Sequence, residues 1–278
     1  MPPQFGPSRG EPPATAASSY REYAAPDTLR PYIECFWTRE VTPSATGVGV
    51  APPHRVLPDG CIDVVLAFSE HGDEPESAMI VGTMTRALVL EPTRDPSCFV
   101  GVRFRPARAT AFLSLPASEL TDLRVSIGDL WPDAEAVREA LAASPEALAR
   151  AQALERVLTA RLTPTAPAGA HDVDEAVRRI VEAGGSLGIT RLAPALGVTR
   201  QHLARRFAQL VGVSPKTFAR VVRLGRVVER ARLVPAGAPI NWSALALEIG
   251  YYDQSHLVDE FREMTGLTPT AWRSVHGG

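Results

Sequence analysis

The stretch HLARRF at residues 202–207 recurs as HLVDEF at residues 256–261, 54 positions further along the chain. The residues after it recur at the same spacing, since GVSP at 212–215 corresponds to GLTP at 266–269. Self-similarity at a fixed spacing indicates two copies of one structural unit. The C-terminal part of the sequence is therefore expected to fold as a pair of related units.

The first copy has the residue order of a helix-turn-helix. A short apolar helix is expected over residues 190–196, and Gly197 suits the left-handed conformation that ends many helices. After a tight turn, Thr199 is placed to cap a second helix that runs to about residue 211. We expect this unit, helix-turn-helix 1, at about residues 190–211.

The second copy ends its first helix at Gly250, 53 positions after Gly197, so its turn holds one more residue. Asp253 is placed to cap the second helix, and helix-turn-helix 2 is expected at about residues 242–265. After the first unit, a Ser-Pro pair puts a capping hydroxyl directly before a proline. This order predicts a long helix over residues 215–233 that connects the two units.

The period of an α-helix predicts which side chains of the second helix in the first unit face outward. Leu203, Phe207 and Leu210 fall on one side, which we expect to be buried. Gln201 and Arg205 lie opposite and are the candidates for reading bases. Glutamine can bind adenine, and arginine can bind guanine, through paired hydrogen bonds worth about 1–3 kcal/mol of discrimination each.

The matching helix of the second unit carries acids where the first carries arginines. Ser255, Asp259 and Arg262 are expected to face outward beside Gln254, and Glu260 follows Asp259 where an approach to phosphate favours bases. We expect weaker or more indirect contact with DNA from this unit. Asp259 either accepts a hydrogen bond from cytosine or is a solvated or salt-bridged acid.

Positive charge is concentrated in the same region, although the whole chain has a net charge of −2. From residue 171 to the end there are 14 Arg and Lys against 10 Asp and Glu, a balance of +4, whereas the rest of the chain has a balance of −6. Between Arg200 and Arg232 nine residues are basic and one is acidic. Such a stripe suits a polyanion because neutralised phosphates release counterions, although a basic run can also be a solvated helix face.

Three of these basic residues, Arg200, Arg206 and Arg223, are assigned to phosphates, which position a protein on DNA without reading its sequence. The full set of residues predicted to bind DNA is Thr199, Arg200, Gln201, Arg205, Arg206, Arg223, Gln254, Ser255, Asp259 and Arg262.

The N-terminal half predicts a sheet, because short apolar runs alternate with turn signals over residues 32–104. The strands are expected around 56–57 and over 61–68, 79–81, 88–90 and 99–104. A short helix is expected over 107–113, and two helices over 133–162 with a break at Ser144-Pro145.

With 278 residues, of which 45% are hydrophobic, the chain can fill two cores. The predicted fold class is α+β, with an N-terminal β-rich sensor or assembly domain with flanking helices and a C-terminal all-α domain of two helix-turn-helix units joined by a long helix. The expected divisions are a disordered tail at 1–17, the regulatory domain at 18–162, a Pro-rich linker at 163–171 and the DNA-binding domain at 172–276.

The run GYYDQSHL at residues 250–257, with Phe261-Arg262 and GLTP at 266–269, resembles the AraC/XylS family of transcription regulators. The likeness covers residues 172–276. It implies that the two recognition helices enter successive major-groove segments about 34 Å apart on one face of double-stranded DNA. It also implies RNA polymerase as a partner.

The N-terminal half is similar to an uncharacterised domain of some family members, through LPDGCID at 57–63, Val81-Gly82 and GVRFRPA at 101–107. In other members a cupin-like sheet domain binds a small inducer and supports dimerisation. A small-molecule effector and a homodimer are therefore expected by analogy of architecture and not from a recognised site.

Catalysis and metal binding are two other possible roles of the N-terminal half. His54, Asp59, Cys61 and Asp63 lie close in sequence and could form an activated nucleophile or a metal site, although no oxyanion motif accompanies them. Packing is the simpler role for Cys61 at the start of an apolar strand. We predict no catalytic residue, no metal and no cofactor.

Two further features of the N-terminal half carry expectations. The three cysteines, Cys35, Cys61 and Cys98, are widely spaced and are expected to be reduced, buried thiols. Arg103 and Arg105 alternate with apolar residues on an expected strand, so at least one should be partly buried against an acid, with anion binding as the alternative.

The first residues are rich in Pro and Gly without the apolar core of a signal peptide, and no segment approaches the roughly 18 apolar residues of a membrane span. A cytoplasmic protein without membrane contact is expected. The predicted function is a sequence-specific DNA-binding transcription regulator that responds to a small-molecule effector. The alternatives are a regulator controlled by a protein partner or by dimerisation, and an enzyme fused to a DNA-binding module.

Overall fold

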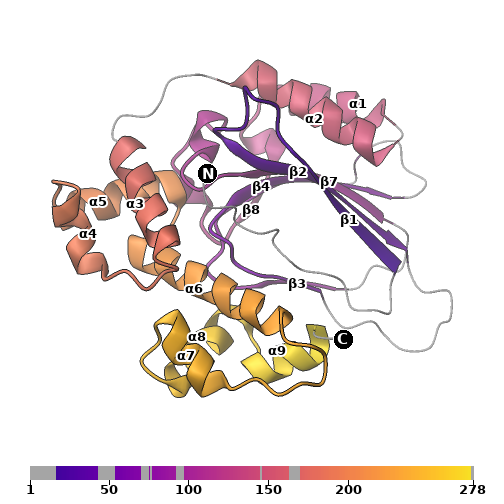
Figure 1. Ribbon diagram of the computed structural model, residues 1–278. Coiled ribbons are helices and arrows are strands. Elements are labelled where there is room, and N and C mark those ends of the chain that lie inside the picture. The colour runs from indigo at the N-terminus through magenta and orange to yellow at the C-terminus, as the bar shows by residue number, and fades with distance from the viewer. Residues whose placement is uncertain are drawn as a thin grey trace.

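The computed structural model describes residues 17–42, 54–69, 75, 77–91, 97–144, 146–162 and 170–276. The N-terminal part is a β-sheet with two helices against one face, and the described residues from 170 onward are helical (Figure 1). The predicted α+β fold class is confirmed. The expected tail at 1–17 and linker at 163–171 lie almost entirely outside the described residues, which begin with a strand at Ala17 and resume with a helix at Ala170.

Within the described residues, six antiparallel strands form the main sheet, and two short strands form a separate pair. The order in the main sheet is β1 (Ala17–Tyr23), β2 (Ile33–Thr42), β7 (Ser97–Phe104), β4 (Ile62–Ser69), β5 (Ser77–Val81) and β8 (Arg124–Ser126). The separate pair is β3 (His54–Val56) with β6 (Leu88–Leu90). The five expected strands are present within a few residues, whereas the polar edge strand β1 (ASSYREY) lacks the apolar alternation that would have predicted it.

The two faces of the sheet have different neighbours. Along β4, Val64, Leu66 and Phe68 are fully buried and alternate with half-buried residues. The buried face packs on α1 (Ala134–Ala142) and α2 (Ala147–Arg161), which confirms the two expected helices. The opposite face looks toward the β3–β6 pair (Figure 1).

The helix expected over 107–113 is wrong in extent. Only a single 3-10 turn forms there, Ala109–Ala111. Ala107 has a φ of +67°, in the left-handed region, so an α-helix cannot begin at this residue.

The C-terminal part contains seven helices in the described residues. They are α3 (Ala170–Glu182), α4 (Ile189–Ala195), α5 (Arg200–Val211), α6 (Pro215–Arg232), α7 (Trp242–Ile249), α8 (Gln254–Thr265) and α9 (Pro269–His276). Two apolar clusters form, one around Phe207 and one around Phe261, and α6 contributes to both. The repeat therefore corresponds to two units with separate cores joined by one helix.

The expected helix ends are also present. Thr199, Ser214 and Asp253 each accept a hydrogen bond from a backbone N–H in the first turn of α5, α6 and α8. Gly197 and Gly250 have φ values of +70° and +97° after α4 and α7. Because only glycine adopts this region without strain, each first helix ends where the sequence predicted.

The sheet domain contacts both units directly. The hydroxyl of Thr83 donates to the carbonyl of Val211 at the end of α5, and that of Thr121 donates to the carbonyl of Gly212, both at 2.5 Å. The amide of Ala87 donates to the carbonyl of Met264 in α8 at 2.7 Å. No helix in the described ranges has the length and apolar character needed to cross a membrane.

Candidate DNA interface and a buried cavity

Helix α5 presents one buried and one exposed face. Leu203, Phe207 and Leu210 are buried in the first cluster, as expected. Gln201 and Arg205 are exposed on the other side, and neither forms an ion pair within the described residues. The helix therefore presents an amide and a free guanidinium outward, which are the groups that bind adenine and guanine in the major groove.

The residues that flank this face differ in their exposure and in their hydrogen-bond partners. Arg200 is exposed in the first turn of α5, where it has no ion pair in the described part of the chain. Arg206 is half-buried and donates to Gln209 at 3.3 Å. Thr199 uses its hydroxyl to accept the amide of His202 at 3.1 Å, so its first role is to cap the helix.

Helix α8 of the second unit is exposed at all four of its predicted contact positions, Gln254, Ser255, Asp259 and Arg262. Asp259 forms no ion pair in the described residues, so the solvated alternative agrees with its surroundings better than the salt-bridged one. The face combines one base, one acid and two neutral polar groups.

Glu260 is the main correction to the sequence-based interpretation. It was expected to weaken the approach to phosphate, because it occupies the place of Arg206, but its side chain is only 6% exposed and binds arginines of α6. Its carboxylate binds Arg220 at 2.8 Å and Arg223 at 3.0 Å. It therefore does not oppose an approach to phosphate, because two arginines of the connecting helix neutralise it.

The same contact changes the role of Arg223, which was predicted to bind phosphate. Its side chain is 15% exposed, and its guanidinium donates to Glu260 and, at 2.8 Å, to the carbonyl of Gly185. Gly185 lies in the turn between α3 and α4, so this side chain joins the two helix-turn-helix units. Arg223 is therefore engaged inside the domain in this structure, and its contact with phosphate stays a prediction.

Other arginines of the basic stripe are also paired within the domain. Arg220 binds Glu263 at 2.5 Å as well as Glu260, and Arg230 of α6 binds Glu248 of α7 at 2.8 Å. A count of charges along the sequence could not separate these residues from free ones. Arg191 of α4, which the sequence analysis did not select, is exposed without an ion pair in the described residues and adds a free base to the first unit.

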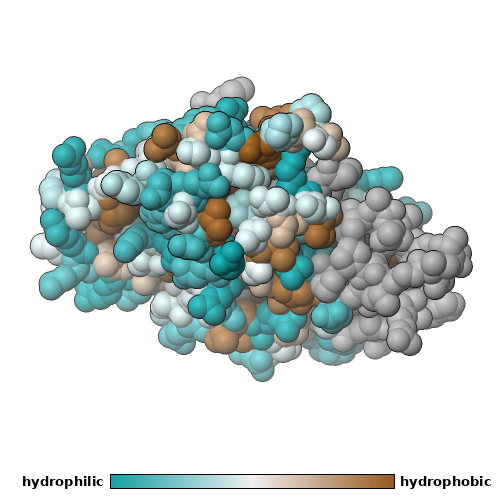
Figure 2. Space-filling view, turned by 90° about the horizontal axis from the view of Figure 1, so that it is seen from below, coloured by the Kyte–Doolittle hydropathy of each residue, from teal (hydrophilic) through white to brown (hydrophobic). Residues whose placement is uncertain are grey.

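Seen from below, on the side of the C-terminal helices, apolar residues appear as separate spots among hydrophilic ones (Figure 2). Tyr252, in the turn before α8, is the most exposed of the large apolar residues at 86%. Scattered exposed apolar residues are normal on a protein surface. The polar character of α5 and α8 is therefore the distinguishing feature of this domain.

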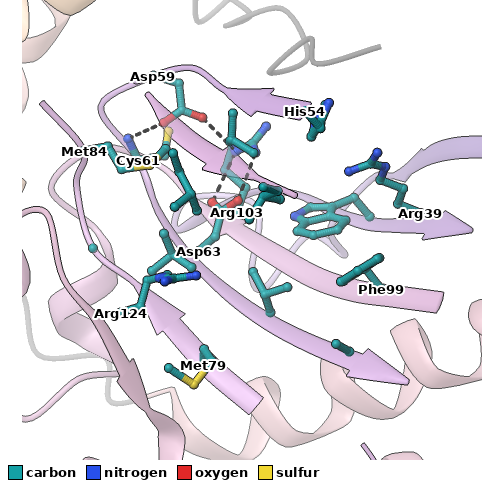
Figure 3. Close-up of a pocket in the computed structure, with 18 of the residues that line it drawn as sticks. Arg39, His54, Asp59, Cys61, Asp63, Met79, Met84, Phe99, Arg103 and Arg124 are labelled. Atoms are coloured by element: carbon teal, nitrogen blue, oxygen red, sulfur yellow. Dashed lines mark hydrogen bonds and ion pairs between the residues drawn. The ribbon is translucent and has the colours of Figure 1, made fainter. Parts of the chain in front are cut away.

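A cavity of about 220 Å³ lies between the main sheet and the β3–β6 pair (Figure 3). This is far more than the roughly 10–15 Å³ that one water molecule needs, so a small organic molecule can fit. The cavity has aromatic, aliphatic and charged walls, and its lining includes Tyr20, Trp37, Arg39, His54, Asp59, Asp63, Met79, Met84, Leu88, Leu90, Phe99 and Arg103.

Gly101 of β7 makes room for the aromatic part of this wall. A Cβ atom on Gly101 would lie 2.4 Å from the indole ring of Trp37, on the neighbouring strand β2. No real Cβ contact is that short, so the indole can lie against β7 only because residue 101 has no side chain. The ring provides a flat apolar surface at the cavity.

A closed ion-pair cluster occupies one end of the cavity. Arg103 is buried and binds Asp63 at 2.9 Å and Asp59 at 3.2 Å. Burial raises the pKa of Asp63, and the charge of Arg103 opposes that change. The expectation that Arg103 or Arg105 is buried against an acid is confirmed, since Arg105 also binds Glu34, at 2.7 Å.

The residues weighed for catalysis or metal binding lie around this cavity but do not converge. Asp59 and Asp63 are engaged with Arg103, and His54 lies apart from them on β3 (Figure 3). Burial raises the pKa of Cys61, which keeps the thiol protonated. The described residues hold three free cysteines, of which Cys35 and Cys61 are buried as expected and Cys98 is half-buried.

Comparisons with known proteins agree with this division of the chain. Residues 192–274 match the family described as a helix-turn-helix domain, and residues 21–126 match a domain of unknown function, DUF6597. The HTH-type transcriptional regulator MtrA of Neisseria gonorrhoeae is 27% identical over 89 residues, which cover 32% of this chain. Those residues span 28% of the length of MtrA.

Solved structures show a looser likeness. ToxT from Vibrio cholerae is 9% identical with a TM-score of 0.44, over 95% of this chain and 100% of its own. The xylose-binding transcription activator XylR is 20% identical with a TM-score of 0.32, over 47% of this chain and 40% of its own. Similarity at these identities and TM-scores does not show that the proteins share a function.

The fold and the exposed helix faces define a class, namely a double helix-turn-helix domain that follows a β-sheet domain. Residues 192–274 form a helix-turn-helix domain of the AraC type, and this part of the chain is similar in sequence to the regulator MtrA. Its N-terminal domain is of the DUF6597 kind.

Proposed function

We propose that the protein is a sequence-specific DNA-binding transcription regulator in which α5 makes the main contact with double-stranded DNA. The observation that carries this proposal is the exposed face of α5, where Arg200, Gln201 and Arg205 point outward on a capped helix and no acid among the described residues pairs with either arginine. Helix α8 adds a weaker contact through Gln254, Ser255, Asp259 and Arg262. Thr199 and Arg206 support the first contact.

Equilibrium binding to DNA tests this proposal. Sites are first selected by the full-length protein from random duplex DNA, and affinity is then measured as the salt concentration rises. We expect replacement of Arg200 by alanine to weaken binding to all sequences alike and to lower the slope of log affinity against log salt by about one. An unchanged slope would remove Arg200 from the interface.

Regulation by a small-molecule effector is the second part of the proposal. Gly82 and Met84 line the cavity, and Thr83 between them is fully buried and donates its hydroxyl to the end of α5. One short segment therefore touches both the cavity and the main recognition helix. A molecule that moves this segment would change the contact between Thr83 and α5. Control by an effector requires such a difference in contacts between the bound and the free state.

Replacing Thr83 by valine should remove the link between the cavity and the recognition helix α5. The change keeps the side-chain shape but removes the donor to Val211, so the carbonyl loses a partner and the free energy of unfolding should fall by about 1–3 kcal/mol. Hydrogen exchange should become faster in the last turn of α5. Thr85→Val is a matched control, because the hydroxyl of Thr85 donates to Asp122 inside the N-terminal domain and not to a carbonyl of α5.

Equal rates of hydrogen exchange in α5 for the two variants would show that Thr83 does not hold the recognition helix.

Control by a protein partner or by dimerisation is the alternative to an effector. We propose the effector over this alternative because the cavity exists and touches Thr83 through its neighbours. Contact with RNA polymerase, homodimer formation, and the domain divisions at 18–162 and 172–276 belong to the same proposal.

A further inference from the structure

One end of the cavity contains donors that nothing in the described part of the chain satisfies. The Nε of Arg39 and the Nδ1 of His54 are buried without a hydrogen-bond partner, and Arg39 forms no ion pair with a described residue. Figure 3 shows Arg39 and His54 together, away from the cluster of Asp59, Asp63 and Arg103. Buried polar groups are almost always hydrogen-bonded, so a pair of unsatisfied ones indicates a missing partner.

The electrostatics at this end favour an anion. Burial lowers the pKa of Arg39, which is the response of a guanidinium that lacks a counter-charge. Burial and the charges of Arg39 and His276 lower the pKa of His54 to about 4. His54 is therefore neutral near pH 7, and its ring can donate one hydrogen bond without adding a second charge.

The acids of the cavity do not neutralise Arg39 at this end. The lining contains three arginines, Arg39, Arg103 and Arg124, and two aspartates, so the balance is +1. Both aspartates bind Arg103. Neither aspartate is therefore available to neutralise Arg39. A cationic ligand would find both acids of the cavity already paired.

The remaining walls fit a flat apolar body. The Trp37 indole lies against the backbone of β7 at Gly101, and Leu88 and Leu90 come from the β3–β6 pair on the other side of the cavity. Aromatic rings pack well against such surfaces. A molecule that filled this space and carried a carboxylate would satisfy Arg39 and His54 together.

We propose that the cavity binds a flat organic carboxylate, with the carboxylate at Arg39 and His54 and the ring system between Trp37 and the β3–β6 pair. This inference rests on the proposed function, in which the N-terminal domain receives an effector, and it names the chemical class of that effector. A guanidinium binds a carboxylate through two parallel hydrogen bonds, which fixes the orientation of the ligand.

Three probes with one ring system and different head groups test the proposal. Indole-3-acetate, indole-3-acetamide and tryptamine carry a negative, a neutral and a positive head, and binding of each to the full-length protein is measured by calorimetry and by the shift of the melting temperature. We expect the acetate to bind at least about tenfold more tightly than the amide, as charge-assisted hydrogen bonds imply. Tryptamine should bind most weakly.

Two variants locate the head group. Arg39→Met keeps much of the apolar stem and should weaken acetate binding by about tenfold or more, while the amide binds within about twofold of its wild-type affinity. Arg21→Met is the matched control, because Arg21 is exposed and its neighbour Tyr20 on β1 is the residue that faces the cavity. This control should bind all three probes as the wild type does.

Equal binding of the three head groups, tighter binding of tryptamine, or no binding of any probe at millimolar concentration would each overturn the proposal. So would an Arg39→Met variant that retains its preference for the acetate. None of these measurements contains DNA, so their failure would leave the DNA-binding proposal intact, and a loss of DNA binding would leave the cavity result intact.

Discussion

Replacing Glu260 by alanine is expected to destabilise the protein by about 3 kcal/mol, the low end of the range for breaking a buried ion pair. Glu260 is 6% exposed and neutralises Arg220 and Arg223, which are 23% and 15% exposed. Without the carboxylate, Arg220 still has Glu263, but Arg223 is left with the carbonyl of Gly185 and the ring of Tyr251, and neither carries a negative charge. An unpaired, mostly buried charge is the reason for the large effect.

Denaturant unfolding of the full chain measures this change, with Glu263→Ala as the matched control. Glu263 also binds Arg220, but it is 53% exposed, so its loss should change the free energy of unfolding by no more than about 1 kcal/mol. Equal, small effects of the two substitutions would contradict the assignment of Glu260 as the charge that joins α6 to α8. Arg223→Ala should likewise lower stability, with little change in the salt slope of DNA binding.

Replacing Arg205 by alanine is expected to weaken binding to the preferred DNA site by about 1–3 kcal/mol, or roughly 5- to 150-fold. The same change should relax the preference for one base and leave binding to unrelated sequences almost unaltered. Arg205 is exposed and unpaired in the described part of the chain, so we expect the fold to be unchanged. Competition binding against sites that differ at each position measures the loss.

Arg178→Ala is the control for this variant. Arg178 is exposed on α3 but binds Glu175 and Glu182, so its removal should leave both affinity and base preference as they were. A footprint and a base preference that do not change in the Arg205 variant would show that α5 does not read this base. A similar loss in the Asp259→Ala variant would show that the two units contribute more equally than their charges suggest.

The sequence alone predicted the helices from α4 to α8 to within one or two residues at their ends. The reason is that a helix-turn-helix is specified by local signals. Capping residues such as Thr199 and Asp253, and glycines such as Gly250, act on the neighbouring turn of the chain. The period of the apolar residues then determined the buried and exposed faces of α5 and α8.

The same reasoning could not find the partners of Glu260 and Arg223, because those partners come from other elements. Within α8 alone Glu260 is an acid in the place of Arg206, and only the packing of α8 against α6 shows that it is buried and paired. Arg223 belongs to a run of basic residues, and nothing in that run distinguishes a paired arginine from a free one. Ion pairs between residues 37 positions apart depend on how helices meet.

The cavity shows the same limit in the N-terminal domain. The sequence brings His54, Asp59, Cys61 and Asp63 to attention because they are neighbours in the chain. Arg39 and Trp37 come from a different strand, and their place at the same cavity depends on the order of the strands. The sequence by itself determined the repeat, the helix ends and the outward face of α5, because each depends on contacts within a few residues. Only the tertiary structure decided which charges are buried and which side chains share a cavity, because both depend on segments far apart in the chain.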